Sequence, residues 1–393
     1  IGSGLVGSEM CIRDRFQIAG GWGGGTFVGS VGVTLNNLSI KNFFKKGAWR
    51  PYPMGQNQRL SISAQTNGTY YKAFAISFTD PWMGGRKPNS FTISAHYSDE
   101  NNAYYAWQKG TRYFRTAGVA AGLGKRLDWP DPYFTFYAEA SYERYMLKDW
   151  NTFVLKNGAA NLLSIRLVLG RNSVDQPIYP RRGSDFSVSV QLTPPYSLWD
   201  GKDYKSTALS EQERYNWIEF HKWMLKGQWF TPLTRNGNLV LMARAEMGYL
   251  GHYNKNKVSP FERFEVGGDG MTGYNMYGID IISMRGYDDG ALDPVGSNYS
   301  CAYNKYTMEL RYPLLLKGQT NIYVLGFLEG GNGFTSWKEF SPFKIKRSAG
   351  IGVRLFLPVV GMVGVDWGWG FDPAAGQTKR SGSHIHFTMG MQF

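Results

Sequence analysis

The sequence contains little cysteine and has no long apolar run. Its 393 residues include two cysteines, Cys11 and Cys301, which are too few for a disulfide framework or a cysteine-based metal site. No stretch approaches the roughly 18 uncharged apolar residues that a membrane-spanning helix needs. Together with a mean hydropathy of -0.35, this excludes a helical membrane protein.

Patterns typical of enzymes are also missing. The sequence has no G-x-S-x-G nucleophile elbow, and its glycine run is not followed by a helix that could cradle phosphate. Only five histidines occur, and they are scattered. His384 and His386 share one face of a strand. The two side chains could bind a metal together, but this spacing is more typical of polar residues that face a lumen. We therefore expect no enzyme activity, no cofactor and no metal.

Aromatic residues and glycine are abundant instead. The chain has 25 Tyr, 24 Phe, 13 Trp and 49 Gly, a composition that suits a membrane β-barrel with aromatic girdles. The formal net charge is +13. The basic residues are scattered among strand ends and loops, with no basic helix, which favours anionic lipid headgroups over nucleic acid as the partner.

Apolar and polar residues alternate with a period of two from about Phe16 to the end, which indicates strands. In the stretch 363–371, valine, tryptophan and phenylalanine alternate with Gly364, Asp366, Gly368 and Gly370. The polar faces carry Ser, Thr, Gln and Gly, as expected of a wide, wet lumen, and the apolar faces are rich in aromatics, as expected of a surface in lipid.

The sequence therefore predicts an all-β fold, a transmembrane antiparallel β-barrel of about sixteen strands. We place the strands near 16–24, 27–38, 58–67, 70–80, 90–99, 112–126, 133–147, 161–173, 184–194, 215–231, 238–251, 304–316, 319–330, 347–358, 361–371 and 383–393.

One connection, residues 253–303, is too long for a plain turn, and loops of this length are usually functional. It contains Arg285 between glycine-rich segments. The strands on either side of this connection carry acids on their inward faces. We therefore predict that the arginine belongs to a charged loop folded into the lumen, where a buried guanidinium needs a carboxylate partner.

The first fifteen residues differ from the rest. Residues 1–15 have no basic segment followed by an apolar one, so they are not a signal peptide, and they resemble translated adaptor sequence. We exclude them from the fold and expect the barrel domain to span residues 16–393.

An ordered set of motifs resembles the BamA family of outer-membrane assembly factors over about residues 16–393, most strongly in the last third. The stretch Met284–Tyr287 reads M-R-G-Y, which is similar to that family's (V/I)-R-G-(F/Y) loop signature. It follows F-E-V-G-G-D-G at 264–270, with an extra stretch, 271–283, between the two. Further matches are T-D-P-W at 79–82, Y-P-R-R-G-S at 179–184, E-L-R-Y-P at 309–313, F-L-E-G-G-N at 327–332, R-S-A-G-I-G-V-R at 347–354 and the C-terminal Phe393.

The resemblance implies a loop lock formed by Arg285, Gly286 and Tyr287 with acids on two following strands. Glu309 fits, because its neighbours face outward by the alternation. Glu329 stands where the family usually has Asp, but its direction is ambiguous, since Leu325 and Phe327 share its parity. The alternative is an ordinary solvated arginine.

The resemblance also implies a lateral seam between the first and last strands. The first strand carries Gly20, Gly21, Gly23 and Gly24, and the last carries Phe387, Gly390 and Phe393. Glycine weakens strand pairing, so this seam could open and template an incoming strand. A tight turn or a bulge is the alternative interpretation of the glycine run.

The function implied is the folding and insertion of client outer-membrane proteins in the bacterial outer membrane. In the family, periplasmic repeat domains precede the barrel and receive clients and accessory lipoproteins, and we expect these domains to be missing from the given sequence. The expected partners are clients, accessory lipoproteins and outer-membrane lipids, and not nucleic acid. The alternatives are a secretion or translocation pore of the same superfamily and a passive porin, which should lack the loop lock.

Overall fold

The computed structural model describes residues 15–389, except 24–25, 46, 50–51, 67–69, 86–87, 103–109, 152, 207, 271–278, 297–298, 318–319 and 358–360. The adaptor-like segment, apart from Arg15, lies outside the described residues. The same holds for three predicted seam residues, Gly24, Gly390 and Phe393. No helix in the described part of the chain is both long and apolar enough to span a membrane.

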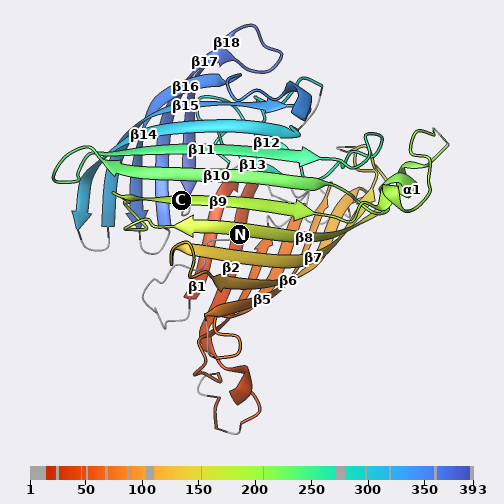
Figure 1. Ribbon diagram of the computed structural model, residues 1–393, viewed down its shortest axis with the longest axis horizontal. Helices are drawn as coiled ribbons and strands as arrows, with labels where there is room; N and C mark the ends of the chain where they lie inside the picture. The colour runs from red at the N-terminus through yellow and green to blue at the C-terminus, as the bar shows by residue number, and fades with distance from the viewer. Residues whose placement is uncertain are drawn as a thin grey trace. The chain divides into compact units, whose positions relative to one another are not determined.

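Sixteen strands follow one another in chain order in one sheet (Figure 1). The strands are β1 (Arg15–Gly23), β2 (Thr26–Leu38), β3 (Gln58–Thr66), β4 (Tyr71–Asp80), β5 (Asn89–Asn101), β6 (Tyr113–Arg126), β7 (Phe134–Lys148), β8 (Gly158–Asn172), β9 (Gly183–Leu192), β10 (His221–Pro232), β11 (Val240–Gly251), β14 (Ala302–Lys317), β15 (Thr320–Phe334), β16 (Lys346–Leu357), β17 (Gly361–Pro373) and β18 (Arg380–Met389). The pairs from β1 to β7 and from β11 to β18 run antiparallel.

The predicted strands match these elements, with one clear difference. The strand expected over 215–231 begins at His221, because the short helix α1 (Glu211–Tyr215) precedes it. Ser210 starts this helix with a capping box, in which its side chain accepts from the backbone N–H of Glu213 and the Glu213 carboxylate accepts in return. Such a box satisfies amide groups that the first helical turn leaves unpaired.

The remaining elements are short and lie in connections. They are the 3-10 turns η1 (Ile40–Asn42), η2 (Tyr196–Leu198) and η3 (Trp337–Glu339), and the two-stranded parallel pair of β12 (Phe264–Val266) and β13 (Asp280–Ile282).

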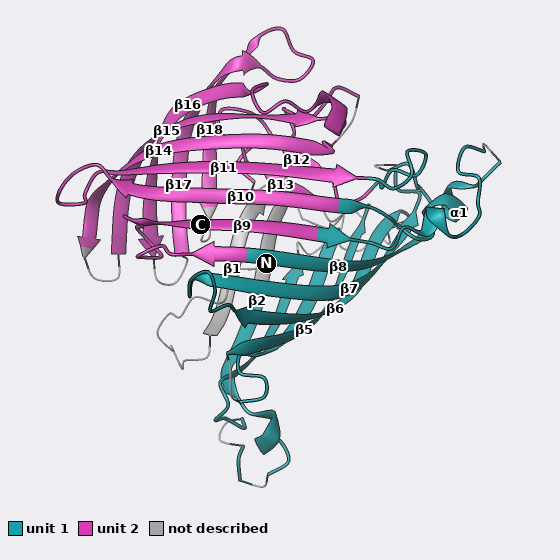
Figure 2. Ribbon diagram, in the orientation of Figure 1, with its two compact units in different colours: residues 1–169, 191–221, 252–260 teal, residues 170–190, 222–251, 261–393 magenta. Residues whose placement is uncertain are grey.

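The chain divides into two compact units (Figure 2). Unit 1 comprises residues 1–169, 191–221 and 252–260, and it contains β1 to β7. Unit 2 comprises residues 170–190, 222–251 and 261–393, and it contains β11 and β14 to β18.

The strands of unit 2 are polar on their buried face and apolar on their exposed face. In β17 the exposed side chains are Val365, Trp367 and Trp369, whereas Asp366 is fully buried. This arrangement is the reverse of a soluble sheet, and it suits strands that face lipid on one side.

The buried face of unit 2 also carries an apolar cluster, composed of Tyr179, Phe230, Val240, Met242, Tyr323, Leu325, Phe327 and Met362. Tyr179 comes from the connection between β8 and β9. Its hydroxyl donates to the carbonyl oxygens of Asn238, at 2.8 Å, and Arg311, at 3.1 Å. Leu325 and Phe327 therefore face inward, although both are apolar.

Candidate functional site

The long connection between β11 and β14 brings its two motif halves together. The backbone N–H of Met284 donates to the carbonyl of Gly268 at 2.9 Å, and the N–H of Gly268 donates to the carbonyl of Tyr287 at 3.2 Å. β13, which belongs to the extra stretch 271–283, pairs in parallel with β12 from the first motif half, beginning with Phe264 opposite Asp280. The glycine-rich entry therefore meets the M-R-G-Y segment despite the insertion.

Arg285 is buried and bound by carboxylates from two strands. Its guanidinium donates to Glu329 Oε1 through Nε (3.1 Å) and Nη2 (2.6 Å), and Nη2 also donates to Glu309 Oε1 (2.7 Å). The backbone N–H of Arg285 donates to Glu329 Oε2 at 2.9 Å. Because one guanidinium meets two acids with fixed geometry, this arrangement is specific as well as strong.

Both acids face inward. Glu309 is 5% exposed, between Met308 at 50% and Leu310 at 44%. Glu329 is also 5% exposed, beside Leu328 at 59%. The ambiguous direction of Glu329 is thus resolved by the fold, since the apolar residues that share its parity also point inward.

Phe327 lies beneath the arginine. The guanidinium carbon of Arg285 is 3.7 Å from the centroid of the Phe327 ring, well within the range of a cation–π contact. An aromatic residue on a polar inner face is therefore a contact surface for the loop.

The ion pairs extend into a network of three arginines and three acids. Glu309 Oε2 accepts from Arg311 Nε at 2.8 Å. Arg354 binds Asp366 through two hydrogen bonds of 2.8 and 2.7 Å, and Asp366 Oδ1 lies 3.6 Å from Arg285 Nη1. Each of these six buried charges has a partner of the opposite sign, which is how buried ions are tolerated.

Gly286 allows the tip of the loop to lie against β17. Its φ is +86°, in the left-handed region where a Cβ is costly. A Cβ there would be 2.9 Å from Ser348 Cβ and 3.0 Å from the Gly370 nitrogen, and one on Gly368 would be 2.8 Å from the Gly286 nitrogen. Tyr287, fully buried, anchors the next position by donating from its hydroxyl to the carbonyl of Arg347 at 2.8 Å.

The same loop contacts β18. The backbone N–H of Gly286 donates to His386 Nε2 at 2.8 Å, and His384 Nδ1 lies 3.1 Å from Asp288 Oδ1. The N–H of Phe387 donates to Asp269 Oδ2 at 3.5 Å. The loop is therefore attached to the last described strand at three places.

The described seam residues lie in the first and last strands. Gly20, Gly21 and Gly23 belong to β1 and pair with Gly29, Val28 and Thr26 of β2 in continuous register. Phe387 lies in β18 with its side chain exposed.

Several residues of the site were not singled out from the sequence. These are Arg311, Phe327 and Asp366, and His386 was expected only as a polar residue facing the lumen. Asp366 carried a usable signal, because it is the one acid in an inward row of glycines, and such a charge needs a buried partner.

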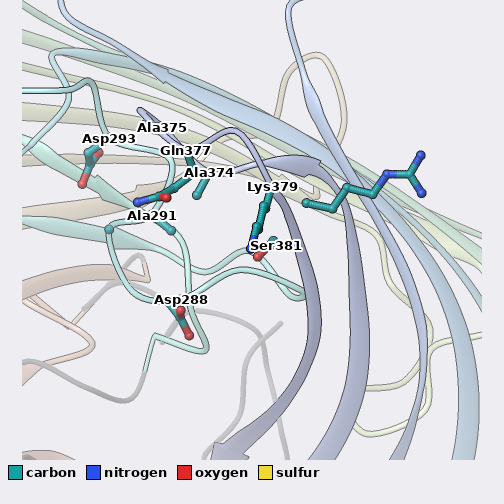
Figure 3. A pocket seen from close by; sticks show the side chains of 10 residues that line it. Asp288, Ala291, Asp293, Ala374, Ala375, Gln377, Lys379 and Ser381 are labelled. Carbon is teal, nitrogen blue, oxygen red and sulfur yellow. The ribbon is translucent and has the colours of Figure 1, made fainter.

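A cavity of about 400 Å³ lies beside the loop (Figure 3). Asp288 and Asp293 line it from the loop, and Gln377 and Lys379 line it from the connection between β17 and β18. Asp293 accepts from Ser300 Oγ at 2.5 Å and from the Val266 N–H at 3.2 Å, and burial raises the pKa of its carboxyl to about 8. Among the residues that the structure describes, no three His, Cys, Asp or Glu side chains are grouped to hold a metal.

Comparison with known proteins identifies the family of the chain. Residues 54–393 match the Omp85 superfamily domain. A curated relative, the outer membrane protein assembly factor BamA of Neisseria meningitidis serogroup B, is 23% identical over 332 residues, which cover 78% of this chain and 34% of that protein. The chain thus spans about a third of the length of this relative.

Solved structures share the fold. BamA from Haemophilus ducreyi lacking POTRA domains 1–3 aligns with a TM-score of 0.64 and 17% identity, covering 95% of this chain and 69% of that one. CdiB from Acinetobacter baumannii aligns with a TM-score of 0.55 and 12% identity, covering 96% and 59%. The predicted fold class is therefore confirmed: an antiparallel outer-membrane β-barrel of about sixteen strands. The predicted location, the bacterial outer membrane, is confirmed as well.

Proposed function

The chain belongs to the Omp85 superfamily, and on this premise we propose that it is the barrel domain of an outer-membrane protein assembly factor. It folds and inserts client β-barrels through a lateral seam between its first and last strands. The relative from Neisseria meningitidis is named as such a factor, and the proposal extends that activity to this chain.

The observation that carries the proposal is the buried position of Arg285. A passive channel needs no arginine held by Glu309 and Glu329, because its pore requires only a polar lining. A buried ion network rarely adds to stability, because the free energy lost in desolvating its charges can exceed the free energy gained from their attraction. We therefore assign it a role: the loop lock fixes the inner wall near the last strand, so that the seam has one defined closed state.

The seam works by strand addition. β1 is rich in glycine, which weakens its pairing, and an opened edge offers unpaired N–H and C=O groups to an incoming strand. The final strand of a client pairs there, and the client barrel grows from that point. Client folding itself supplies the free energy, so no covalent chemistry is involved.

Three kinds of partner follow from this mechanism. Client outer-membrane proteins bind at the seam, and outer-membrane lipids cover the exposed aromatic face. Accessory lipoproteins are the third kind of partner.

The test is client folding in proteoliposomes. A denatured outer-membrane barrel is diluted into liposomes with or without this protein, and folding is followed by the shift of the folded client on unheated gels. The proposal requires folding several-fold faster than in empty liposomes. Equal rates, with ion conductance present, would instead favour a passive porin, and export of an unfolded passenger would favour a secretion pore.

A further inference from the structure

The loop that carries Arg285 is attached to β18 by three contacts, and none of them involves the arginine. Gly286 donates to His386, Asp288 pairs with His384, and Asp269 accepts from the Phe387 amide. The loop residues lie in separate parts of the connection, at its glycine-rich entry and at its tip.

The contact with His386 is the most enclosed of the three. His386 is 4% exposed, and its Nε2 must carry a lone pair to accept the Gly286 N–H, so the ring is neutral with its proton on Nδ1. The charged or titratable groups that face this ring are Asp269 of the loop, His384 of β18, Asp366 of β17 and Glu329 of β15.

The contact with Asp269 lies at the edge of the sheet. Phe387 is opposite Val365 in the register of β17 and β18, and its N–H points at a loop carboxylate. In an antiparallel ladder, residues whose N–H does not serve one neighbouring strand direct it to the other side. The amide of Phe387 is thus one of the groups that β18 would offer to a strand added at its outer edge.

We propose that Asp269, Gly286 and Asp288 form a clasp on His384, His386 and Phe387, which holds β18 against the loop and occupies an edge amide until a strand displaces it. The clasp rests on the proposed function for its purpose, but its geometry is independent of any client. It makes Asp269 and His386 positioning residues of the seam.

The clasp couples opening of the edge to the position of the loop. A strand that pairs with Phe387 takes the hydrogen bond of Asp269, because one N–H cannot serve two acceptors well. Outward movement of β18 also breaks the bond from Gly286, whose backbone is held against Gly368 and Gly370 of β17. The loop and the last strand therefore separate together.

Hydrogen–deuterium exchange of residues 380–389 in lipid nanodiscs tests the clasp directly. We expect Asp269→Ala and His386→Ala each to speed exchange in β18 about fivefold to tenfold, the factor that one lost hydrogen bond of ordinary strength gives. Asp269→Asn and His386→Gln keep an acceptor and should restore exchange to near the wild-type rate. Asp175→Ala is the matched control, because its carboxylate accepts amides of Arg181 and Arg182 in another connection.

Unchanged exchange in both alanine variants would overturn the clasp. So would equal exchange in alanine and conservative variants, since that outcome means that the substitutions act only through packing. The test of the clasp is independent of the test of the proposed function. A protein that shows these exchange rates but does not speed client folding has the clasp without the assembly activity. A second measurement covers variants that fold poorly, namely the rate at which a synthetic extended peptide with alternating aromatic residues crosslinks to β18, which should rise in Asp269→Ala.

Discussion

Arg285 lies over the ring of Phe327, with 3.7 Å between the guanidinium carbon and the ring centroid. The ring comes from the same strand as Glu329, two residues away, so β15 supplies both a charge partner and an apolar platform. A lysine has no planar group to match this site, so it cannot replace the arginine fully.

Replacing Arg285 should impair client folding more than ion conductance. Arg285→Ala leaves Glu309 and Glu329 buried without their shared partner, a change that costs roughly 3–5 kcal/mol when a buried pair is broken. Arg285→Lys should restore only part of the activity. Folding rates in proteoliposomes and conductance in planar bilayers measure the two effects, with Arg347→Ala, whose ion pair is exposed, as the control. Client folding unaffected by Arg285→Ala would rule out the loop lock.

Glu309 and Arg311 should show strong coupling. Glu309→Gln removes the carboxylate that Arg311 contacts at 2.7 Å. The guanidinium of Arg311 then stays buried without this partner. Adding Arg311→Met should recover part of the lost stability, because removing both partners of a buried pair is often close to neutral. Urea unfolding of the single and double variants gives the coupling energy, and additive effects would contradict the network.

Gly286→Ala should be far more damaging than Gly296→Ala. Both glycines have positive φ, +86° and +80°, so an alanine meets similar backbone strain of about 1–2 kcal/mol at either position. A Cβ at Gly296 meets nothing within 4 Å, whereas one at Gly286 meets Ser348 and β17. Thermal unfolding compares the two variants, and equal losses would show that the close contact of the tip with β17 is unimportant.

Asp293 should make the stability of the loop depend on pH. Burial raises its pKa from 3.8 to about 8, so the folded loop binds a proton that the unfolded loop has lost. The stabilisation is complete below pH 3.8 and falls as pH rises towards about 8, by up to about 1.4 kcal/mol per pH unit.

Asp293→Asn keeps the shape of the side chain without the titration and should flatten this profile. Hydrogen exchange of loop amides across pH 4 to 8, corrected for intrinsic exchange, measures it. A wild-type profile that rises with pH would have the wrong sign for a buried neutral acid.

The strands could be predicted from the sequence because alternation is a local property of each segment. The inward direction of Glu309 followed from the same parity. The direction of Glu329 did not, since Leu325 and Phe327 face a lumen that contains an apolar cluster and a loop, and neither is visible in the alternation of one strand.

The contacts with β18 could not be predicted for a different reason. Gly286 and His386 are separated by 100 residues, and the bond forms only after the loop has folded back onto β17. The glycines at 368 and 370 carried a signal, because small inward residues leave room for close approach of another backbone. The start of β10 was missed because the residues before it pair elsewhere: Asn216 and Ile218 form backbone hydrogen bonds with Asn161 of β8.

In the proposed mechanism a client strand pairs at the opened seam, and β18 forms one edge of that seam. Phe387→Cys places a thiol on this strand, and single cysteines scanned through the last strand of a client report which positions come next to it during assembly. We expect disulfides at alternate client positions, because the side chains of a paired strand alternate between two faces. No disulfide, or equal yields at every position, would contradict strand addition at this edge.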